Sequence, residues 1–364
     1  MLEKLEDFIY VPDMPQDKKV KKIMIIGAGG IISDCHLPAY RLAGYDVAGI
    51  YDRAVEKAEA LAKEYGIPKA YGEIESFLAD AIEYDAVFDI ALPASALVEI
   101  LPQLPDGAGV LMQKPMGESL EEAKMILDIC HAKKFIAGVN FQLRQAPYVI
   151  AAKEFIDSGK LGEIVDIEIR ETANTPWHLW TFLYGIERME INYHSIHYVD
   201  LMRYLIGDPK KVLCKTMKHP NSPNLAQVKT NIILDYGDTL RAGIVTNHNH
   251  VYGLEEQESQ IKIEGTKGAM KIVMGVYLDY PKGLPDVVKV NLLEDGLGWR
   301  DVEVTGSWFP EAFTGTMGGL LRKFEDPTSH FVNNVDDAYK TMCLVETCYQ
   351  SDAEGGTMLV KDTE

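Results

Sequence analysis

Residues 23–36 read IMIIGAGGIISDCH, and this stretch decides the fold. Four apolar residues, Ile23–Ile26, stop at Gly27-Ala28-Gly29-Gly30, and apolar residues at helical spacing follow through 31–40. A short apolar run that ends in glycines before such a pattern predicts a buried parallel strand turning tightly into a helix. The turn presents free backbone N–H groups and the positive end of a helix, an arrangement that suits a bound phosphate.

The same alternation continues to about residue 140. Short apolar runs (DVAGIYD, AVFDIAL, GVLMQ and FIAGVN) are separated by helical patterns such as RAVEKAEALAKEYG and SLEEAKMILDICHAKK. Alternating strands and helices predict right-handed crossovers and a doubly wound parallel sheet. Residues 22–145 are therefore predicted to form one α/β domain, preceded by an N-terminal extension over 1–21.

A different organisation is predicted for residues 146–364. Strand-like segments follow one another, and ILDYGDTLRAG and IKIEGTKGAMKIV have the turn residues of hairpins. These features predict a second α/β domain with a large, mostly antiparallel open sheet. The final amphipathic helix, VDDAYKTMCLVETCYQSDAEG, is expected to pack on either domain.

Composition excludes several classes of protein. The chain has 364 residues, 47% of them hydrophobic, and a formal net charge of −19. Such an acidic surface repels nucleic acids and anionic membranes, so neither partner is expected. No stretch approaches the ~20 apolar residues of a membrane span, and the N-terminus has no secretory hydrophobic region. Five scattered cysteines without CxxC spacing predict reduced thiols in the cytoplasm.

An acidic residue follows the glycine turn at the spacing of a dinucleotide site. Asp52 ends the next strand, about 20 residues on, where a carboxylate can accept hydrogen bonds from a ribose 2′-hydroxyl. Its charge also repels a 2′-phosphate, which favours NAD over NADP, whereas a guanidinium at Arg53 could grip that phosphate. The alternative is a glycine turn in a doubly wound domain that binds no nucleotide.

Lys114 lies in GVLMQKPMG, just past the end of a parallel strand, where such sheets bind their ligands. Its charge could stabilise an alkoxide that develops on a substrate hydroxyl. The alternative is a solvated loop lysine.

Two histidine pairs have spacings that could place both members on one face. His194 and His197 are three residues apart on a helix, and His248 and His250 are two apart on a strand. Four imidazoles could bind zinc or another transition metal. The preferred interpretation has no metal and gives the strand histidines a role in binding substrate hydroxyls.

An aromatic-rich loop, TPWHLWTF, contains Trp177, His178 and Trp180. Tryptophan faces stack on the apolar faces of sugar rings, so this loop is a candidate substrate lid. The alternatives are a hydrophobic plug or a subunit contact.

Several motifs occur together in order: GAGGI with HLPAY, LP at 92–93, QKP at 113–115, GVNFQLR, HSIHYVD and GSWFPEAF. Together they resemble the Gfo/Idh/MocA oxidoreductases, named for glucose–fructose oxidoreductase and inositol 2-dehydrogenase. The resemblance implies a Rossmann domain followed by an α/β domain whose open sheet commonly mediates oligomerisation. It also implies NAD(P) and a sugar, polyol or glycoside substrate.

The family's catalytic pattern is only partly kept. Its Glu-Lys-Pro becomes Gln113-Lys114-Pro115, which retains the lysine thought to bind substrate. Its catalytic histidine falls on His197, but the aspartate four residues earlier is replaced by Tyr193. Tyr193 or His194 could supply the missing hydrogen bond, or that role could be absent.

The sequence therefore predicts an NAD-dependent dehydrogenase acting on a ring hydroxyl of a sugar, cyclitol or glycoside, with the glucosyl C3 hydroxyl as one candidate. Two alternatives remain: a cofactor-binding regulator and a metal-assisted lyase or isomerase. A homodimer or homotetramer through the second sheet is expected. The predicted catalytic residues are Lys114, His197, Tyr193 and His194. The predicted cofactor contacts are Gly27, Gly29, Gly30, Ile31, Asp52, Arg53, Leu92, Pro93, Gln113, Lys114 and Asn140. The predicted substrate contacts are Lys114, Arg144, Trp177, His178, Trp180, His197, His248 and His250.

Overall fold

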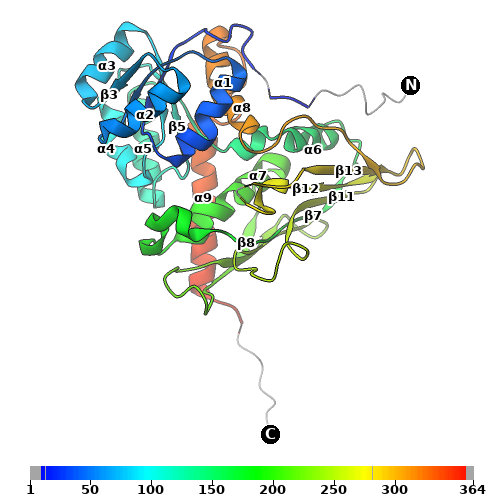
Figure 1. Cartoon of the computed structure of the whole chain (residues 1–364). Helices are drawn as coiled ribbons and strands as arrows, with labels where there is room; N and C mark the ends of the chain where they lie inside the picture. The colour runs from blue at the N-terminus through cyan, green and yellow to red at the C-terminus, as the bar shows by residue number, and fades with distance from the viewer. Residues whose placement is uncertain (1–9, 13, 281, 358–364) are drawn as a thin grey trace.

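A computed structural model describes residues 10–12, 14–280 and 282–357 (Figure 1). The first nine residues of the predicted extension lie outside this range. Two sheets organise the chain, one of six strands and one of eight. The Rossmann-type sheet and the larger second sheet are both confirmed.

The first sheet is parallel throughout, in the order β3-β2-β1-β4-β5-β6. Its strands are β1 (Ile23–Ile26), β2 (Val47–Tyr51), β3 (Lys69–Tyr71), β4 (Val87–Ile90), β5 (Gly109–Met112) and β6 (Ile136–Val139). The strand order reverses between β1 and β4, and ligands of such sheets bind at the carboxyl ends beside this reversal. Both the glycine turn and Lys114 lie at these ends.

Helices connect these strands as the alternating pattern predicts. They are α1 (Leu37–Ala43), α2 (Val55–Tyr65), α3 (Ile74–Glu83), α4 (Leu97–Ile100) and α5 (Leu120–Ala132). A further helix, α6 (Pro147–Asp157), follows β6 and leads to the second sheet. A π-helical turn, Ile32–His36, precedes α1 and sets the direction of the side chains just after the glycines. Such turns are frequent at functional sites.

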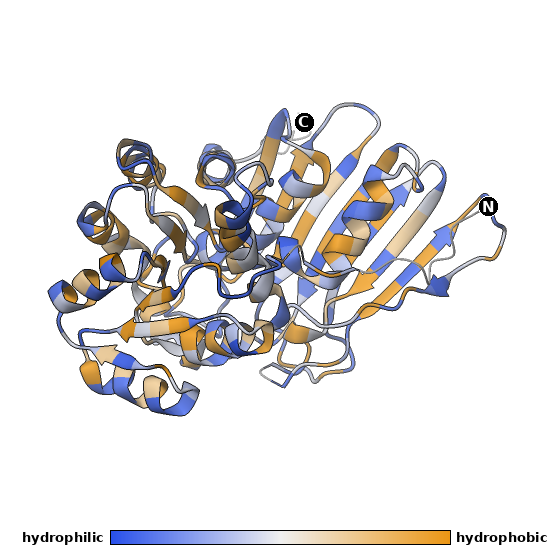
Figure 2. Ribbon diagram, turned by 90° about the horizontal axis from the view of Figure 1, so that it is seen from above, coloured by the Kyte–Doolittle hydropathy of each residue, from blue (hydrophilic) through white to orange (hydrophobic). Residues whose placement is uncertain are grey.

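The second sheet has the order β14-β13-β12-β11-β7-β10-β9-β8. Its strands are β7 (Ile164–Thr172), β8 (Lys211–Met217), β9 (Lys229–Asp235), β10 (Arg241–Asn247), β11 (Glu258–Gly265), β12 (Gly268–Val273), β13 (Val287–Leu292) and β14 (Arg300–Asp301). Both predicted hairpins are confirmed as the antiparallel pairs β9–β10 and β11–β12. The pair β7–β10 is parallel, which no local pattern indicated. Figure 2 shows the alternation of hydrophobic and hydrophilic residues along these strands.

Three further helices, α7 (Ile196–Ile206), α8 (Glu311–Glu325) and α9 (Val335–Glu354), complete the described chain. α9 contacts β8 of the second sheet and β6 of the first, and Figure 1 shows it running along their junction. α8 was not predicted; its Phe313, Met317 and Leu320 share a buried cluster with Ile23 and Ile25 of β1. A helix from the C-terminal third of the chain therefore completes the hydrophobic core of the first domain. The boundary at residue 145 stays a prediction.

No helix in the described residues has both the length and the apolar character needed to cross a membrane.

Candidate active site

The glycine turn has the geometry of a dinucleotide cradle. Gly27 has φ +105°, and a Cβ there would lie 2.5 Å from the backbone oxygen of Ala91, so only glycine fits. Gly29 and Gly30 are exposed; a Cβ at Gly29 would meet nothing within 4 Å and one at Gly30 only Asp34 Oδ2 at 3.8 Å, which leaves room for a ligand to approach the backbone. The residues present therefore fit a dinucleotide phosphate.

Asp52 ties the end of β2 to this turn. One carboxylate oxygen accepts a hydrogen bond from Ala28 N–H and the other from Ala54 N–H, each at 2.8 Å. The carboxylate is half-buried, and Arg53 beside it is exposed. Asp52 and Arg53 therefore lie next to the glycine turn, which is the position expected of residues that contact the cofactor. Of the remaining predicted contacts, Leu92 packs beside Gly27, while Ile31 is half-buried and Pro93 is exposed.

A buried polar network under the turn was not predicted. His36 Nδ1 lies 2.7 Å from Asp89 Oδ2, which also accepts the Tyr40 hydroxyl at 2.8 Å. The side-chain nitrogens of Gln113 and Asn140 lie 3.1 and 3.2 Å from His36 Nε2. With Nδ1–H donated to Asp89, Nε2 accepts from both amides. His36 thereby holds the side chains of Gln113 and Asn140, two predicted cofactor contacts that follow the neighbouring strands β5 and β6. In the sequence, this network is indicated only by the HLPAY motif and by an aspartate within VFDIA.

Lys114 extends from the end of β5 to the second half of the chain. Its ammonium donates a 2.6 Å hydrogen bond to the backbone carbonyl of Tyr193. Tyr193 lies in a second π-helical turn, Ile191–Ser195, just before α7. The carbonyl supplies an acceptor for the lysine where the family has an aspartate. Because this acceptor is uncharged, burial dominates and lowers the pKa of Lys114 to about 8.

His197 begins α7 on the same side as this lysine. Its side chain is buried, its Nδ1 has no hydrogen-bond partner, and its ring lies edge-on to Trp308 at 5.3 Å. Burial, reinforced by the Lys114 charge, lowers the pKa of His197 well below its usual value. Burial together with the charges of His248, Lys114 and His197 has the same effect on the pKa of His194. Lys114 Nζ bonds the carbonyl of the residue before His194, so Lys114, His194 and His197 lie within electrostatic reach of one another and are called the histidine cluster.

Aromatic rings surround His194. Trp177, His248 and Trp180 have ring centroids 4.9, 4.7 and 6.3 Å from it. Tyr277, which no motif indicated, lies at 6.4 Å. The predicted tryptophan loop therefore does reach the histidine cluster, although His178 between the two tryptophans is exposed.

The two predicted histidine pairs meet only in part. His248 contacts His194, whereas the ring of His250 contacts Tyr252 at 5.5 Å. His248 Nδ1 lies 3.0 Å from Thr175 Oγ1, and its Nε2 lies 3.0 Å from Glu190 Oε1. In the part of the chain that the structure describes, no group of three or more His, Cys, Asp or Glu side chains could hold a metal ion.

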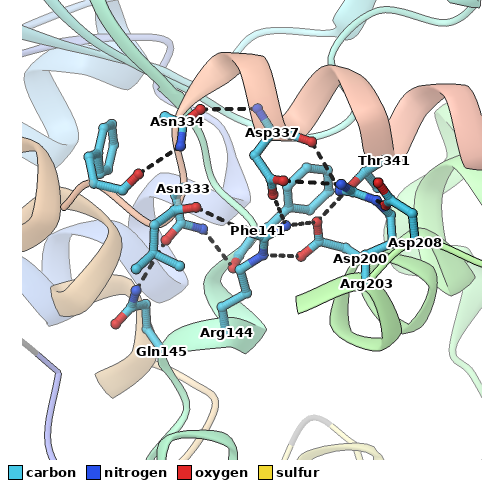
Figure 3. Close-up of polar contacts among 12 residues, drawn as sticks. Phe141, Arg144, Gln145, Asp200, Arg203, Asp208, Asn333, Asn334, Asp337 and Thr341 are labelled. Atoms are coloured by element: carbon cyan, nitrogen blue, oxygen red, sulfur yellow. Dashed lines mark hydrogen bonds and ion pairs between the residues drawn. The ribbon is translucent and has the colours of Figure 1, made fainter. Parts of the chain in front are cut away.

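Arg144 is placed differently from its predicted substrate-binding role. Its guanidinium is buried and bonds both carboxylate oxygens of Asp200, at 2.7 and 2.6 Å, and Asp337 at 2.6 Å (Figure 3). The third guanidinium nitrogen, Nη1, donates to the carbonyl of Val332 at 2.9 Å. The side chain joins α7 to α9 and is directed at these carboxylates. No sequence pattern indicated this ion pair, because Asp337 lies 193 residues away in sequence.

Two segments of the chain match known protein families. Residues 21–141 match the Oxidoreductase family, NAD-binding Rossmann fold (GFO_IDH_MocA), and residues 149–271 match the GFO/IDH/MocA C-terminal domain. Together the matched segments cover more than half of the chain.

Two relatives and one solved structure illustrate how much of this chain aligns with known proteins. A D-apiose dehydrogenase from Rhizobium rhizogenes is 26% identical over 86% of this chain and 90% of its own. A glucose-6-phosphate 3-dehydrogenase from Bacillus subtilis is 29% identical over 94% of this chain and 99% of its own. The crystal structure of an oxidoreductase from Agrobacterium radiobacter with NAD+, L-tartaric acid and magnesium has TM-score 0.77 at 21% identity, covering 93% of this chain and 98% of that one.

These comparisons give no support to a regulator or a metal-assisted lyase, because the curated relatives carry the names of oxidoreductases. The chain therefore belongs to the Gfo/Idh/MocA family of NAD-dependent oxidoreductases.

Proposed function

We propose that this protein oxidises a ring secondary alcohol of a sugar, cyclitol or glycoside, with Lys114 and His197 acting on the same hydroxyl. The observation that supports the proposal is the hydrogen bond from Lys114 Nζ, just past the end of β5, to the carbonyl of Tyr193, which lies four residues before His197. NAD, when bound at that turn, supplies the hydride acceptor. His197 accepts the hydroxyl proton, and its low pKa keeps the imidazole neutral and ready to do so.

Lys114 stabilises the oxygen as negative charge develops on it. Its ammonium is held by an uncharged carbonyl and has no salt bridge to a carboxylate among the residues that the structure describes, so its charge is available to the substrate oxygen. We assign Nε2 as the His197 nitrogen that reaches the substrate, since Nδ1 is buried without a hydrogen-bond partner.

The aromatic groups support a carbohydrate ring as the substrate. Trp177 and Trp180 have ring contacts with His194, which lies three residues before His197. Apolar faces of sugar rings stack on such surfaces while their hydroxyls bond to imidazole and ammonium groups. The glucose-6-phosphate 3-dehydrogenase relative makes the C3 hydroxyl of a glucosyl unit the first candidate.

The test is a panel of monosaccharides, cyclitols and glycosides, each incubated with the protein and NAD while NADH absorbance is followed. At least one class should give saturable NADH formation. Failure of every class, with dinucleotide binding intact, would contradict the proposal.

Asp52 is proposed to accept a hydrogen bond from the 2′-hydroxyl of the adenosine ribose of NAD. Asp52→Ala should raise KM for NAD by about tenfold or more, because it removes a charged hydrogen-bond acceptor, and should narrow the preference for NAD over NADP. Initial rates with each dinucleotide measure both effects. Glu56→Ala, an exposed neighbour, serves as the control. An unchanged cofactor ratio would exclude the ribose role.

A homo-oligomer through the second sheet is also proposed. In the described chain, no helix covers the face of this sheet opposite α7 and α9 (Figure 1). On that face Leu213 and Ile233 are cross-strand neighbours and are 58% and 54% exposed. Leu213→Glu should shift a dimer towards the monomer in analytical ultracentrifugation, whereas Leu42→Glu on α1 should not. A mass unaffected by Leu213→Glu would contradict this interface.

We place the enzyme in the cytoplasm, because all five cysteines are free thiols in the structure.

A further inference from the structure

Two of the four tryptophans in the sequence are buried with an unsatisfied indole N–H. Trp308 is 0% exposed and Trp177 is 7% exposed, and among the described residues neither Nε1 has a hydrogen-bond partner. An indole N–H can only donate, and a buried donor without an acceptor costs free energy that native proteins rarely leave uncompensated. Both groups therefore call for an acceptor that the described part of the chain does not supply.

Each of the two indole rings lies against a different histidine of the histidine cluster. The Trp177 ring centroid is 4.9 Å from that of His194, with an angle of 75° between the ring planes. The Trp308 centroid is 5.3 Å from that of His197, with an angle of 88°. Tyr277 links the two contacts, because its ring lies 6.4 Å from His194 and 5.4 Å from Trp308. One unsatisfied donor is thus held beside each histidine.

Two polar side chains in ring contact with the tryptophans are already engaged elsewhere. The Tyr198 ring lies 6.4 Å from Trp308, but its hydroxyl donates to Glu171 Oε2 at 2.7 Å. The His248 ring lies 5.4 Å from Trp177, but each of its nitrogens lies 3.0 Å from a side-chain oxygen of another residue. An oxygen-rich substrate bound at the histidine cluster would bring acceptors to both indole groups.

We propose that Trp177 and Trp308 bind the substrate by donating their indole N–H groups to the two hydroxyl oxygens next to the reacting hydroxyl, one on each neighbouring ring carbon. This inference rests on the proposed function, which places the reacting hydroxyl between Lys114 and His197. It narrows the substrate class to rings with three consecutive hydroxyl-bearing carbons, of which the reacting carbon is the middle one. C3 of a glucosyl unit and the carbons of a cyclitol meet this condition, whereas C4 of a glucosyl unit does not.

The same chemistry predicts which substituents the site rejects. Because an indole N–H cannot accept, a group that offers only donors at either neighbouring carbon leaves the indole unpaired. A protonated 2-amino sugar should therefore be a poor substrate for oxidation at C3. A hydroxyl, which accepts as well as donates, should be the preferred substituent at both positions.

Selective nitrogen-15 labelling of tryptophan tests the two hydrogen bonds directly. The four indole signals are assigned with Trp177→Phe, Trp180→Phe and Trp299→Phe, and the remaining one belongs to Trp308. In the dead-end complex with NADH and an alcohol substrate from the panel, the Trp177 and Trp308 protons should move to higher chemical shift, because each gains an acceptor. Trp299, which is 49% exposed, is the control and should stay in place. Either of the first two signals remaining in place would overturn the proposal.

Deoxy analogues test the same contacts in the unmodified enzyme. Loss of the hydroxyl on either neighbouring carbon should lower kcat/KM by about tenfold or more, because a buried donor is left unpaired. For a substrate oxidised at C3, these are the 2-deoxy and 4-deoxy analogues, and the 6-deoxy analogue is the control. A loss no larger for the first two analogues than for the control would contradict the proposal.

Trp177→Phe and Trp308→Phe separate hydrogen bonding from packing. Each keeps an aromatic ring but removes one N–H, so each should lower kcat/KM for the parent substrate and reduce the discrimination against one of the two deoxy analogues. A merely structural role would lower activity on the parent and both analogues by the same factor. Trp299→Phe should change neither quantity. If Trp308→Phe fails to fold, Trp177→Phe and the analogue series still decide the outcome.

The closing comparison separates this inference from the proposed function. A panel in which no sugar, cyclitol or glycoside is oxidised would contradict the proposed function itself. An active panel in which the indole signals stay in place, or in which neighbouring hydroxyls make no difference, would contradict only the role of the two tryptophans.

Discussion

Lys114→Ala and His197→Ala should each lower turnover by about 10²-fold or more while leaving the fold and NADH binding in place. Removing the imidazole removes the base, which contributes roughly 10²–10⁴-fold in comparable reactions. Removing the ammonium removes the charge that stabilises the developing alkoxide, a contribution of similar size. Steady-state kcat with the best substrate of the panel measures both losses, and NADH fluorescence titration checks that the cofactor still binds.

The pH profile distinguishes the two residues. Lys114 must carry its charge, and its pKa of about 8 means that turnover should fall as the pH rises through that value. His197 must be neutral, and its pKa well below 6.5 places the acid limb well below that pH. Lys114→Ala should therefore abolish the basic limb of the residual activity, whereas His197→Ala should abolish an acid limb.

Matched exposed residues provide the controls. Lys57→Ala and His131→Ala remove a surface lysine and a surface histidine and should leave kcat within about twofold, as expected for exposed side chains. Near-normal turnover in Lys114→Ala or His197→Ala would show that the assigned role belongs to another group.

Local sequence patterns predicted the parts of the site that lie within single turns. The glycine turn follows from an apolar run and glycines within ten residues. Lys114 follows from a strand that ends at Gln113-Lys114-Pro115, and His197 follows from its family motif. Each of these patterns is complete within a short segment, so no knowledge of the tertiary structure was needed.

The groups that hold these residues in place could not be predicted in the same way. His36 meets Asp89, Gln113 and Asn140 across 53, 77 and 104 residues of sequence, and Glu190 meets His248 across 58. A buried polar residue shows in the sequence only as a break in an apolar pattern, which does not identify its partner. The parallel pairing of β7 with β10 and the packing of α8 on β1 are long-range for the same reason.

Arg144→Ala should destabilise the protein by about 3–5 kcal/mol, the range for removing one partner of a buried ion pair. Asp200 is 1% exposed, and without the guanidinium its carboxylate keeps, among the described residues, the hydrogen bond from the Thr341 hydroxyl at 2.7 Å. Asp337 retains Arg203, at 3.1 Å. A carboxylate left buried in this way must be protonated or hydrated, and both carry a cost. Urea unfolding followed by circular dichroism measures the change in free energy.

The same variant separates a structural from a substrate-binding role. Because Arg144 joins α7 to α9 rather than facing the histidine cluster, Arg144→Ala should lower stability while KM changes little at temperatures where the protein remains folded. Lys153→Ala removes a surface pair with Asp157 and should cost about 0.5 kcal/mol or less. A large rise in KM with an unchanged free energy of unfolding would show instead that Arg144 binds the substrate. The expected result instead makes Arg144 the residue that fixes α7, and with it His197, against α9.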